Sequence, residues 1–373
     1  MKVALIHDFL NQVGGAEKVL RVFHELFPKA PVFTITYDKS ETGDVFDDMD
    51  VRTSFIQKLP FGPRRYKWYL AWMPSAIEQF DLSSFDVVLS DCSAYSKGVV
   101  TKPNTLHICY CHSPTRYLWS DTHAYTEELK QPSIIKKGLP IILNRIRVWD
   151  RLAAERVDKF IANSQNVAER IKKYYYRESD VIYPPVEIGQ FKRPTKRGDY
   201  YLIVSRLRPY KRVDLAVEAF NALELPLKII GTGEEDKKLR KIAKSNIEFL
   251  GPVDDQTKSE LLSSCLAFIH PQEEDFGIAA VEAMAAGRPV IAYQKGGALE
   301  TVKAGVSGEF FADQTPWSLV DVVREFKPDR YHPEEIRKRV ADFDISIFKQ
   351  KIKDYVEKAY EEHQRNKIEL RKK

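Results

Sequence analysis

The hydrophobic positions along the chain form short, nearly continuous apolar runs that alternate with segments of helical periodicity. Short apolar runs bounded by turn residues are typical of strands in parallel sheets, because such strands are covered on both faces. The runs form two series, separated near Pro184 and Pro185. The first series is 3–6, 32–36, 86–89, 106–111, 159–162 and 181–183, and the second is 201–204, 227–230, 247–250, 266–269, 290–293 and 308–311.

Helical periodicity fills many of the gaps between these runs, for example at 16–27, 166–175, 213–223 and 258–263. Strands that alternate with helices predict an α/β fold in which helices cover parallel sheets. Paired prolines continue neither a strand nor a helix, so we predict two doubly wound domains, at 1–185 and 186–345. The charged segment 346–373 has apolar residues at helical spacing, and we expect an amphipathic helix that packs back on the first domain.

The composition fits this picture. A chain of 373 residues exceeds the roughly 250–300 residues at which single cores stop growing. The net charge of +5, from 58 basic and 53 acidic residues, is too balanced to indicate a nucleic-acid partner. No apolar stretch approaches the roughly 20 residues of a membrane span, and the first strand starts almost at Met1, so we expect a cytoplasmic protein without a signal peptide. Four cysteines suit a reducing compartment, and their spacing does not favour a metal site.

Residues 274–290 form a loop that leads from an apolar run into a helix. Gly277 opens this helix, whose first N–H groups lack internal partners and carry the positive end of the dipole, an arrangement that suits phosphate. Glu274 and Glu282 flank the helix start, and carboxylates accept hydrogen bonds from sugar hydroxyls. A capped core helix with a solvated Glu282 is the alternative for this segment taken alone.

Three other polar segments follow predicted strands, at the edge where ligands bind in open parallel sheets. Gly14 and Gly15 follow the first strand, and their backbone could approach a ligand closely or make a simple tight turn. Arg206 and Lys211 follow the first strand of the second domain, and two cations could stabilise a departing diphosphate or simply be solvated. His112 ends another apolar run, where it could contact a substrate hydroxyl or be a structural residue.

Together these motifs resemble the retaining glycosyltransferases of family 4, which have the GT-B fold. The resemblance rests first on Glu274-x7-Glu282, which continues into Ala-Met-Ala-Ala-Gly-Arg-Pro-Val. It rests further on the Ser-Arg-Leu segment with Arg206 and Lys211, and on Gly14-Gly-Ala-Glu. The family usually has Lys-Gly where this chain has Lys-Arg at 211–212, a departure that keeps the charge and changes the local turn. The fold implied by the resemblance is two Rossmann-like domains that face each other across a cleft.

The resemblance also implies a role for each candidate residue. Glu282 would hold the nucleotide ribose, and Glu274 would contact hydroxyls of the donor sugar. Arg206 and Lys211 would bind the diphosphate. His112 would lie beside the donor sugar. Backbone groups that would complete the donor site belong to Gly14, Gly15, Phe276, Gly277 and Ile278.

The reaction implied by the family is transfer of a hexose with retention at the anomeric carbon, without a metal or another cofactor. The leaving diphosphate would take the acceptor proton on the same face. The opening His-Asp-Phe-Leu at 7–10 is similar to bacterial mannosyltransferases of surface polysaccharide assembly, so GDP-mannose is the first candidate donor and UDP-glucose the second. The acceptor would be a lipid-linked or polysaccharide glycan. A nucleotide-sugar epimerase and a non-catalytic glycan-binding subunit are the alternatives, and the missing dinucleotide fingerprint disfavours an oxidoreductase.

The segment 55–74 differs in composition from the rest of the first domain. It carries six aromatic rings and no acidic residue, and its basic residues are Lys58, Arg64, Arg65 and Lys67. Basic and aromatic residues together suit an anionic membrane interface, so this segment predicts contact with the inner leaflet. A partly buried helix pair with a basic outer face explains the composition equally well.

Overall fold

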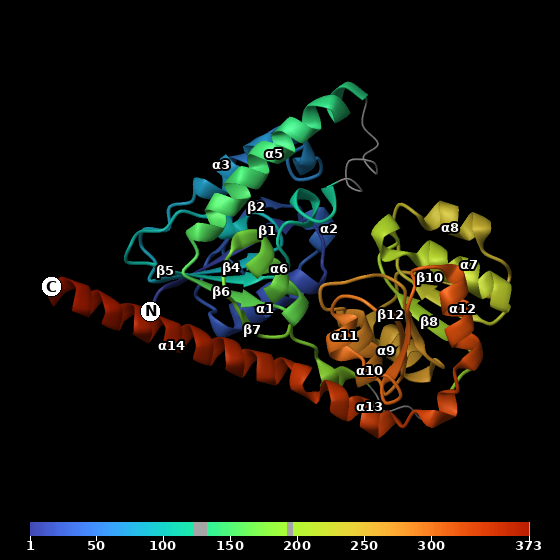
Figure 1. Ribbon diagram of the computed structural model, residues 1–373. Helices are drawn as coiled ribbons and strands as arrows, with labels where there is room; N and C mark the ends of the chain where they lie inside the picture. The colour runs from blue at the N-terminus through green and yellow to red at the C-terminus, as the bar shows by residue number, and fades with distance from the viewer. Residues whose placement is uncertain (123–132, 192–196, 373) are drawn as a thin grey trace. The chain divides into compact units, whose positions relative to one another are not determined.

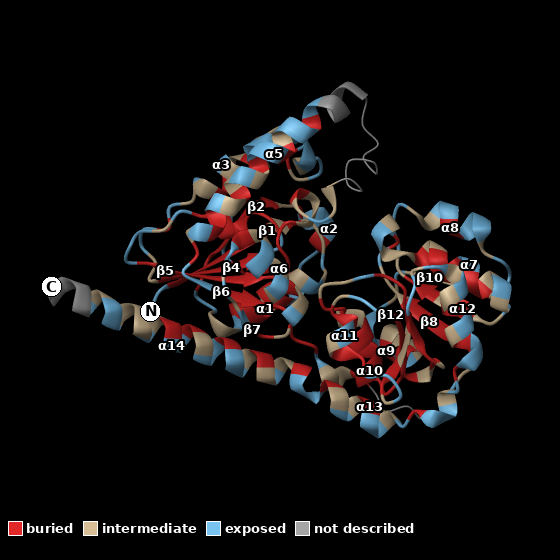
Figure 2. Cartoon of the chain, viewed as in Figure 1, coloured by how far each residue is buried: buried red, intermediate tan, exposed pale blue. Residues whose placement is uncertain are grey.

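The structure, a computed structural model, describes residues 1–122, 133–191 and 197–372. These residues form two compact units (Figure 1). The N-terminal unit comprises Met1–Tyr183 and Phe348–Lys373, and the C-terminal unit comprises Pro184–Ile347. Within each unit the strands are largely buried, and the helices around them expose one face (Figure 2).

The N-terminal unit is built on a seven-stranded parallel sheet in the order β3-β2-β1-β4-β5-β6-β7. Strand β1 pairs with β2 on one side and with β4 on the other, so the strand order reverses direction between β1 and β4. Ligands in open α/β sheets bind outside the carboxyl ends of the strands at such a switch point. The strands are β1 (Val3–Leu10), β2 (Val32–Tyr37), β3 (Val51–Thr53), β4 (Val87–Cys92), β5 (Leu106–Cys111), β6 (Lys159–Ala162) and β7 (Asp180–Val181).

Helices and 3-10 turns connect these strands. Helix α6 begins where Ser164 Oγ accepts a hydrogen bond from the Val167 amide at 3.1 Å, which satisfies one of the unpartnered N–H groups of the first turn. The helices of the unit are α1 (Gly15–Leu26), α2 (Lys39–Thr42), α3 (Met73–Glu78), α5 (Ser133–Glu155), α6 (Gln165–Tyr175) and α14 (Ile345–Lys372), and the 3-10 helices are η1 (Phe55–Lys58), η2 (Tyr66–Trp72), η3 (Ser96–Gly98) and η4 (Arg116–Leu118).

Helix α14 packs its apolar face on the N-terminal unit. The ring of Phe348 stacks on that of Phe23, with centroids 6.0 Å apart, and meets Tyr110 edge-on at 5.7 Å. At the surface, the Lys349 ammonium of α14 forms an ion pair with the Glu25 carboxylate of α1 at 2.6 Å. The last position of the predicted tail helix, Lys373, lies outside the described residues.

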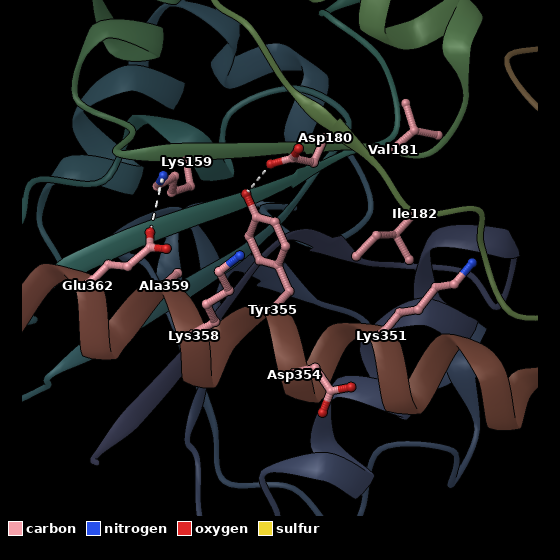
Figure 3. Close-up of a pocket in the computed structure, with 10 residues that line it drawn as sticks. All are labelled: Lys159, Asp180, Val181, Ile182, Lys351, Asp354, Tyr355, Lys358, Ala359 and Glu362. Atoms are coloured by element: carbon pink, nitrogen blue, oxygen red, sulfur yellow. Dashed lines mark hydrogen bonds and ion pairs between the residues drawn. The ribbon is translucent and has the colours of Figure 1, made fainter.

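A shallow pocket lies between α14 and the edge of the sheet at β6 and β7 (Figure 3). The Tyr355 hydroxyl points toward Asp180 and donates a hydrogen bond to its carboxylate at 2.8 Å. Burial and this hydrogen bond raise the pKa of Tyr355 well above its usual value. Lys159 and Glu362 form an ion pair of 3.7 Å at the far end of the pocket. This ion pair and the hydrogen bond of Tyr355 connect α14 to the edge of the sheet.

The C-terminal unit contains a six-stranded parallel sheet in the order β10-β9-β8-β11-β12-β13. Strand β8 pairs with both β9 and β11, so the strand order reverses between β8 and β11. The strands are β8 (Tyr201–Val204), β9 (Leu227–Ile230), β10 (Ile247–Gly251), β11 (Phe268–His270), β12 (Val290–Tyr293) and β13 (Gly308–Phe311).

Two helices of this unit begin at side-chain caps. Asp254 Oδ1 accepts from the Thr257 amide at 2.8 Å, and Thr315 Oγ1 accepts from the Ser318 amide at 3.3 Å. The helices are α7 (Val213–Leu223), α8 (Asp236–Ile242), α9 (Asp255–Ser264), α10 (Ile278–Ala285), α11 (Ala298–Thr301), α12 (Pro316–Glu325) and α13 (Pro333–Val340), and the 3-10 helices are η5 (Ile188–Gln190), η6 (Pro209–Lys211), η7 (Pro328–Arg330) and η8 (Ala341–Phe343).

The predicted fold class is confirmed, since both sheets are parallel and helices alternate with the strands. Strand β3 was not anticipated, because a three-residue strand leaves too short a pattern to recognise. Helix α5 was not among the named candidates either, and it carries Pro140 in its interior, which argues against a helix when the sequence is read alone.

The described residues contain neither a membrane-spanning helix nor a cluster of metal-binding side chains. None of their helices combines the length and the apolar character needed to cross a bilayer. Nor do any three histidine, cysteine, aspartate or glutamate side chains among them gather into a group that could hold a metal ion.

Candidate functional site

Two polar loops of the C-terminal unit start at its switch point. The loop after β8 contains Arg206 and Lys211, and the loop after β11 contains Glu274 and Gly277. Strands β8 and β11 are paired neighbours, with Phe268 opposite Leu202, so both loops leave the sheet at the same edge. The two motifs that the sequence placed on separate strands therefore share the position where parallel sheets bind ligands.

Lys211 and Glu274 are in direct contact. The Lys211 ammonium donates to Glu274 Oε1, although the two residues are 63 positions apart. Both side chains are partly buried, with exposed fractions of 15% and 19%. Gln272 Nε2 donates to the same carboxylate oxygen at 3.2 Å, so Glu274 is held from two sides.

Gly277 makes the turn that starts α10. Its φ of 88° lies in the left-handed region, which side chains rarely adopt, and it is the residue before the helix. A Cβ atom at this position would lie 3.2 Å from His270 Nε2, so the backbone approaches the histidine closely. The turn leaves the first amides of α10 at the switch point, with the positive end of the helix dipole.

His270 and Gln272 form a buried layer beneath this loop. Burial, and then the charge of Lys211, lower the pKa of His270 to about 3, so the ring is neutral at physiological pH. Gln272 Nε2 lies 3.3 Å from His270 Nδ1. Within the described part of the chain, His270 Nε2 and Gln272 Oε1 are buried and have no hydrogen-bond partner. Buried polar atoms of this kind are rare and are expected to bind water or a ligand.

Glu282 is buried within α10, with an exposed fraction of 4%. Its carboxylate pairs with the Lys258 ammonium of α9 at 3.3 Å. Burial by itself would lower the pKa of Lys258, but the charges of Glu282 and Asp255 outweigh it and raise that pKa. The carboxylate is therefore anchored to a neighbouring helix, which contradicts the alternative of a merely solvated Glu282.

The turn at 211–212 accommodates an arginine in the place of glycine. Arg212 has φ 49° and ψ 35°, a left-handed conformation that costs a non-glycine residue free energy. Its guanidinium donates to Asp214 at 3.3 Å and to Gln314 at 3.1 Å, and these contacts offset part of that cost. The arginine at this position therefore adopts a left-handed conformation of the kind that glycine favours, and Arg206 is exposed at the start of the same loop.

In the N-terminal unit, the Gly14-Gly15 turn connects β1 to α1. The Gly14 amide donates to Glu17 Oε2 at 2.9 Å, so Glu17 caps its own helix. A Cβ atom at Gly14 would lie 3.0 Å from that oxygen, so a larger residue would displace the Glu17 side chain. Gly15 is the first residue of α1, where its amide carries the positive end of the helix dipole.

His112 directly follows β5. Its Nε2 atom lies 2.5 Å from Asp91 Oδ1, and the other oxygen of Asp91 lies 2.8 Å from His7 Nδ1. His7 in turn lies 3.7 Å from Glu17 through Nε2. These four side chains connect the turn of the first helix with the histidine predicted beside the donor sugar.

Family comparisons match most of the chain. Residues 187–343 match the family described as "Glycosyl transferases group 1", and residues 13–190 match "Glycosyltransferase Family 4". The chain belongs to family 4 of the glycosyltransferases. The resemblance predicted from the motifs is confirmed, as is the class of enzyme, a glycosyltransferase of a retaining hexosyltransferase family.

Individual relatives are distant. The family 4 chain is 27% identical, over 84% of its own length and 74% of the relative's, to an alpha-1,3/1,6-mannosyltransferase (ALG2) of Saccharomyces cerevisiae. A D-rhamnosyltransferase (WbpZ) of Pseudomonas aeruginosa is 26% identical over 45% of this chain and 50% of that protein. The crystal structure of Anabaena HepE in complex with UDP superimposes with a TM-score of 0.71 at 18% identity, covering 96% of this chain and all of that one. The last comparison supports the predicted GT-B fold.

Four side chains that hold the candidate residues of this family 4 enzyme were missed by sequence reasoning. They are Lys258 at Glu282, Gln272 at Glu274, and the pair Asp91 and His7 behind His112. Gln272 lies two residues before Glu274 and could have been suspected from that proximity. Lys258 and Asp91 come from other elements than the residues they contact, and no pattern in the sequence marks them. His7 belongs to the opening His-Asp-Phe-Leu segment, but nothing in that segment indicates its contact with Asp91.

Proposed function

We propose that this family 4 glycosyltransferase transfers a hexose, with mannose from GDP-mannose as the first candidate, to a lipid-linked or polysaccharide acceptor. Membership of the family implies a nucleotide-sugar donor. We propose that the domain predicted at 186–345 binds the donor and that the domain predicted at 1–185 binds the acceptor. Transfer would retain the anomeric configuration, with the leaving diphosphate taking the acceptor proton.

The observation that carries the proposal is the meeting of Lys211, Glu274 and the start of α10 at one switch point. A cation and helix amides suit a diphosphate, and their charge stabilises the leaving group as the glycosidic bond breaks. Within this arrangement Arg206 and Lys211 would bind the diphosphate, and Glu274 would accept from sugar hydroxyls. The backbone groups proposed to complete the site belong to Gly14, Gly15, Phe276, Gly277 and Ile278.

Glu282 and His112 have proposed contacts with the ends of the donor. Glu282, anchored by Lys258, would accept from the ribose hydroxyls. His112, anchored by Asp91, would contact the donor sugar. Both anchors fix the rotamer of the contacting group, which lowers the entropy lost on binding.

The identity of the sugar rests on names of relatives. The ALG2 protein of yeast is named a mannosyltransferase, which favours mannose. Anabaena HepE was crystallised with UDP and with UDP-glucose, which favours a UDP-hexose as the second candidate. Because the first comparison has the higher sequence identity, we rank GDP-mannose first.

A thermal-shift panel with GDP-mannose, GDP, UDP-glucose, UDP and NAD tests the donor. A ligand at 100 times its Kd stabilises the native state by about 2.7 kcal/mol, which raises the melting temperature of a unit of this size by about 5–10 °C. We expect the largest shift with GDP-mannose. A shift with NAD alone would contradict the assignment, and a shift with UDP-glucose alone would select the second candidate.

Two single substitutions test the residues that we propose to bind the diphosphate. Lys211→Ala and Arg206→Ala should each weaken both donor binding and turnover, because each removes a charge from the diphosphate. Lys238→Ala is the matched control, since it removes an exposed lysine of α8 in the same unit. Full activity of either site variant would sink the assignment. Analysis of the product separates transfer to a glycan from the release of a free epimerised sugar.

We further infer that residues 55–74 contact the anionic inner leaflet. Three large apolar side chains of this segment are exposed, Phe61 at 65%, Trp68 at 56% and Trp72 at 59%. The Arg65 guanidinium lies over the Trp68 ring at 4.4 Å, so basic and aromatic groups share one surface. Such a surface suits the headgroup region, where a lipid-linked acceptor would be presented.

Liposome sedimentation tests the membrane contact. The triple variant Arg64→Glu, Arg65→Glu and Lys67→Glu should lose sedimentation with anionic vesicles, because it replaces attraction by repulsion. In the matched control, the three basic residues on the exposed face of α8 in the other unit, at 237, 240 and 241, are replaced by glutamate. If both variants sediment with the vesicles as fully as the parent protein does, the segment does not bind the membrane.

A further inference from the structure

A continuous line of ionisable side chains runs through the N-terminal unit, in the order Glu17, His7, Asp91 and His112. His7 and Asp91 are partners in the register of β1 and β4, which places them side by side at the carboxyl end of the sheet. Asp91 lies between two histidines, 2.8 Å from His7 Nδ1 and 2.5 Å from His112 Nε2. Strands β1, β4 and β5 are consecutive in the sheet, so the line crosses three neighbouring strand ends (Figure 1).

Only the last group in this line is accessible to solvent. His7, Asp91 and Glu17 have exposed fractions of 3%, 1% and 3%, whereas the His112 side chain is 13% exposed. Three buried ionisable groups in contact are costly unless they compensate one another. Nothing in the proposed donor contacts accounts for His7 or Asp91, so their arrangement calls for a separate explanation.

The charges along the line alternate. Burial alone would lower the pKa of His7, but the carboxylates of Asp91 and Glu17 outweigh it and raise that pKa to about 10. Burial would likewise raise the pKa of Asp91, but His112 and His7 outweigh it and lower that pKa. At neutral pH His7 is therefore an imidazolium between two carboxylates.

This alternation determines which nitrogen of His112 remains for a ligand. An ionised Asp91 only accepts, so His112 Nε2 donates to it. Among the described residues His112 Nδ1 has no hydrogen-bond partner.

We propose that Asp91 and His7 are positioning residues that act through His112. Asp91 orients the ring so that Nδ1 is the atom offered to a donor-sugar hydroxyl, and His7 provides the counter-charge that keeps Asp91 ionised. The proposal rests on the proposed role of His112 beside the sugar. The ionisable groups that face the line are Glu17 from α1 and Tyr110 from β5, whose ring lies 5.3 Å from that of His112. Burial raises the pKa of Tyr110, so it stays neutral.

The first test follows His112 directly by NMR of the chain with labelled histidine rings. The Nε2 proton of His112 should be protected from exchange with water, because Asp91 accepts it, and this protection should be reduced in Asp91→Asn and in His7→Gln. His112→Gln assigns the resonance. His24→Gln, which removes another buried histidine of the same unit, is the matched control and should leave the protection unchanged.

The second test is kinetic, with the nucleotide sugar that the donor panel selects. Asp91→Asn and His7→Gln should lower kcat by about tenfold or more, the size expected when one hydrogen bond to a charged group is lost. The Kd for the nucleoside diphosphate should not change, since neither Asp91 nor His7 is proposed to contact it. This loss of kcat without a loss of nucleotide affinity is a split that a purely structural role would not produce.

The possible outcomes distinguish a failure of this proposal from a failure of the proposed role of His112 beside the sugar. Unchanged protection of the His112 Nε2 proton in Asp91→Asn and His7→Gln, or full kcat in Asp91→Asn, overturns the proposal. Full activity of His112→Gln overturns the proposed contact with the sugar, while the NMR measurement still decides whether Asp91 and His7 control the ring. If Asp91→Asn does not fold, judged by melting temperature and nucleotide binding, His7→Gln and Glu17→Gln carry the test. Glu17→Gln should act in the same direction as His7→Gln, because loss of the Glu17 carboxylate lowers the pKa of His7 and reduces its positive charge.

Discussion

The buried His107 makes a quantitative prediction about acid stability. Its ring is fully buried in β5, and burial followed by the charge of Arg156 lowers its pKa to about 3, from an ordinary value of 6.5. The unfolded chain therefore binds a proton below pH 6.5 that the folded chain does not bind. Stability must fall as the pH falls from 6.5 toward 3, because protonation favours the unfolded state.

The size of the effect follows from these two values. At pH 5 the unfolded His107 is about 1.5 units below its titration midpoint, and each unit corresponds to about 1.36 kcal/mol. We therefore expect His107 to remove about 2 kcal/mol from the free energy of unfolding between neutral pH and pH 5. His107→Gln should abolish this loss, since glutamine does not titrate and its amide could still reach Ser90, which lies 2.9 Å from His107 Nε2.

Tryptophan fluorescence in urea provides the assay. Four of the five tryptophans, at 68, 72, 119 and 149, belong to the N-terminal unit, so a Trp317→Phe parent reports on that unit alone. Ser90→Ala is the control, because it removes the hydrogen bond and leaves the buried ring, and it should keep the acid sensitivity. If His107→Gln loses as much stability between pH 7.5 and pH 5 as the parent, the reasoning from burial is refuted.

Three further variants have defined outcomes. Gly277→Ala should lower the affinity for a nucleoside diphosphate by about tenfold, since it adds about 1–2 kcal/mol of backbone strain and crowds His270. Gly251→Ala is the control, because Gly251 also has a positive φ but open space around it, and it should leave the affinity unchanged. Lys258→Met should destabilise the C-terminal unit by about 1–3 kcal/mol in thermal unfolding, because it removes the cation that pairs with a buried carboxylate. A change no larger than that of the exposed Lys238→Met would contradict the importance of this pair. Lys97→Met should lower the free energy of unfolding by about 3–5 kcal/mol, since the ammonium of Lys97, 1% exposed, has a buried carboxylate partner at 2.5 Å. Urea unfolding followed by tryptophan fluorescence measures this loss, and an unchanged urea midpoint would show that the pair is dispensable.

The sequence predicts the parts of the site that lie close together along the chain. Glu274, Gly277 and Glu282 share one strand-loop-helix segment, and the spacing of that segment indicates a helix start near two carboxylates. Arg206 and Lys211 follow another apolar run, and the carboxyl ends of parallel strands lie at one edge, so their convergence with Glu274 could be expected. The contact between Lys211 and Glu274 in the structure matches that expectation.

Partners that depend on strand order could not be predicted in this way. His7 meets Asp91 because β1 lies next to β4, a neighbour relation that periodicity does not specify. Lys258 likewise reaches Glu282 only because α9 packs beside α10, and its own surroundings in the sequence are those of an ordinary surface helix. For the same reason, the contacts of Asp150 in α5 could not be predicted. Asp150 accepts hydrogen bonds from Trp119 at 2.8 Å and from Tyr175 at 2.9 Å.

The pairing of Glu274 with Lys211 bears on the chemistry proposed for them. A carboxylate that accepts from an ammonium and from the Gln272 amide is arranged to accept hydrogen bonds, so it is poorly suited to act as the acid that protonates a leaving group. If a diphosphate binds as proposed, the ammonium would pair with the diphosphate, and Glu274 would accept from sugar hydroxyls. The ammonium would then keep an anionic partner, and the hydroxyls would supply hydrogen bonds to the carboxylate. We therefore infer that the pair is a pre-arranged receptor for the donor, and that the diphosphate itself is the better candidate for the base in the transfer step.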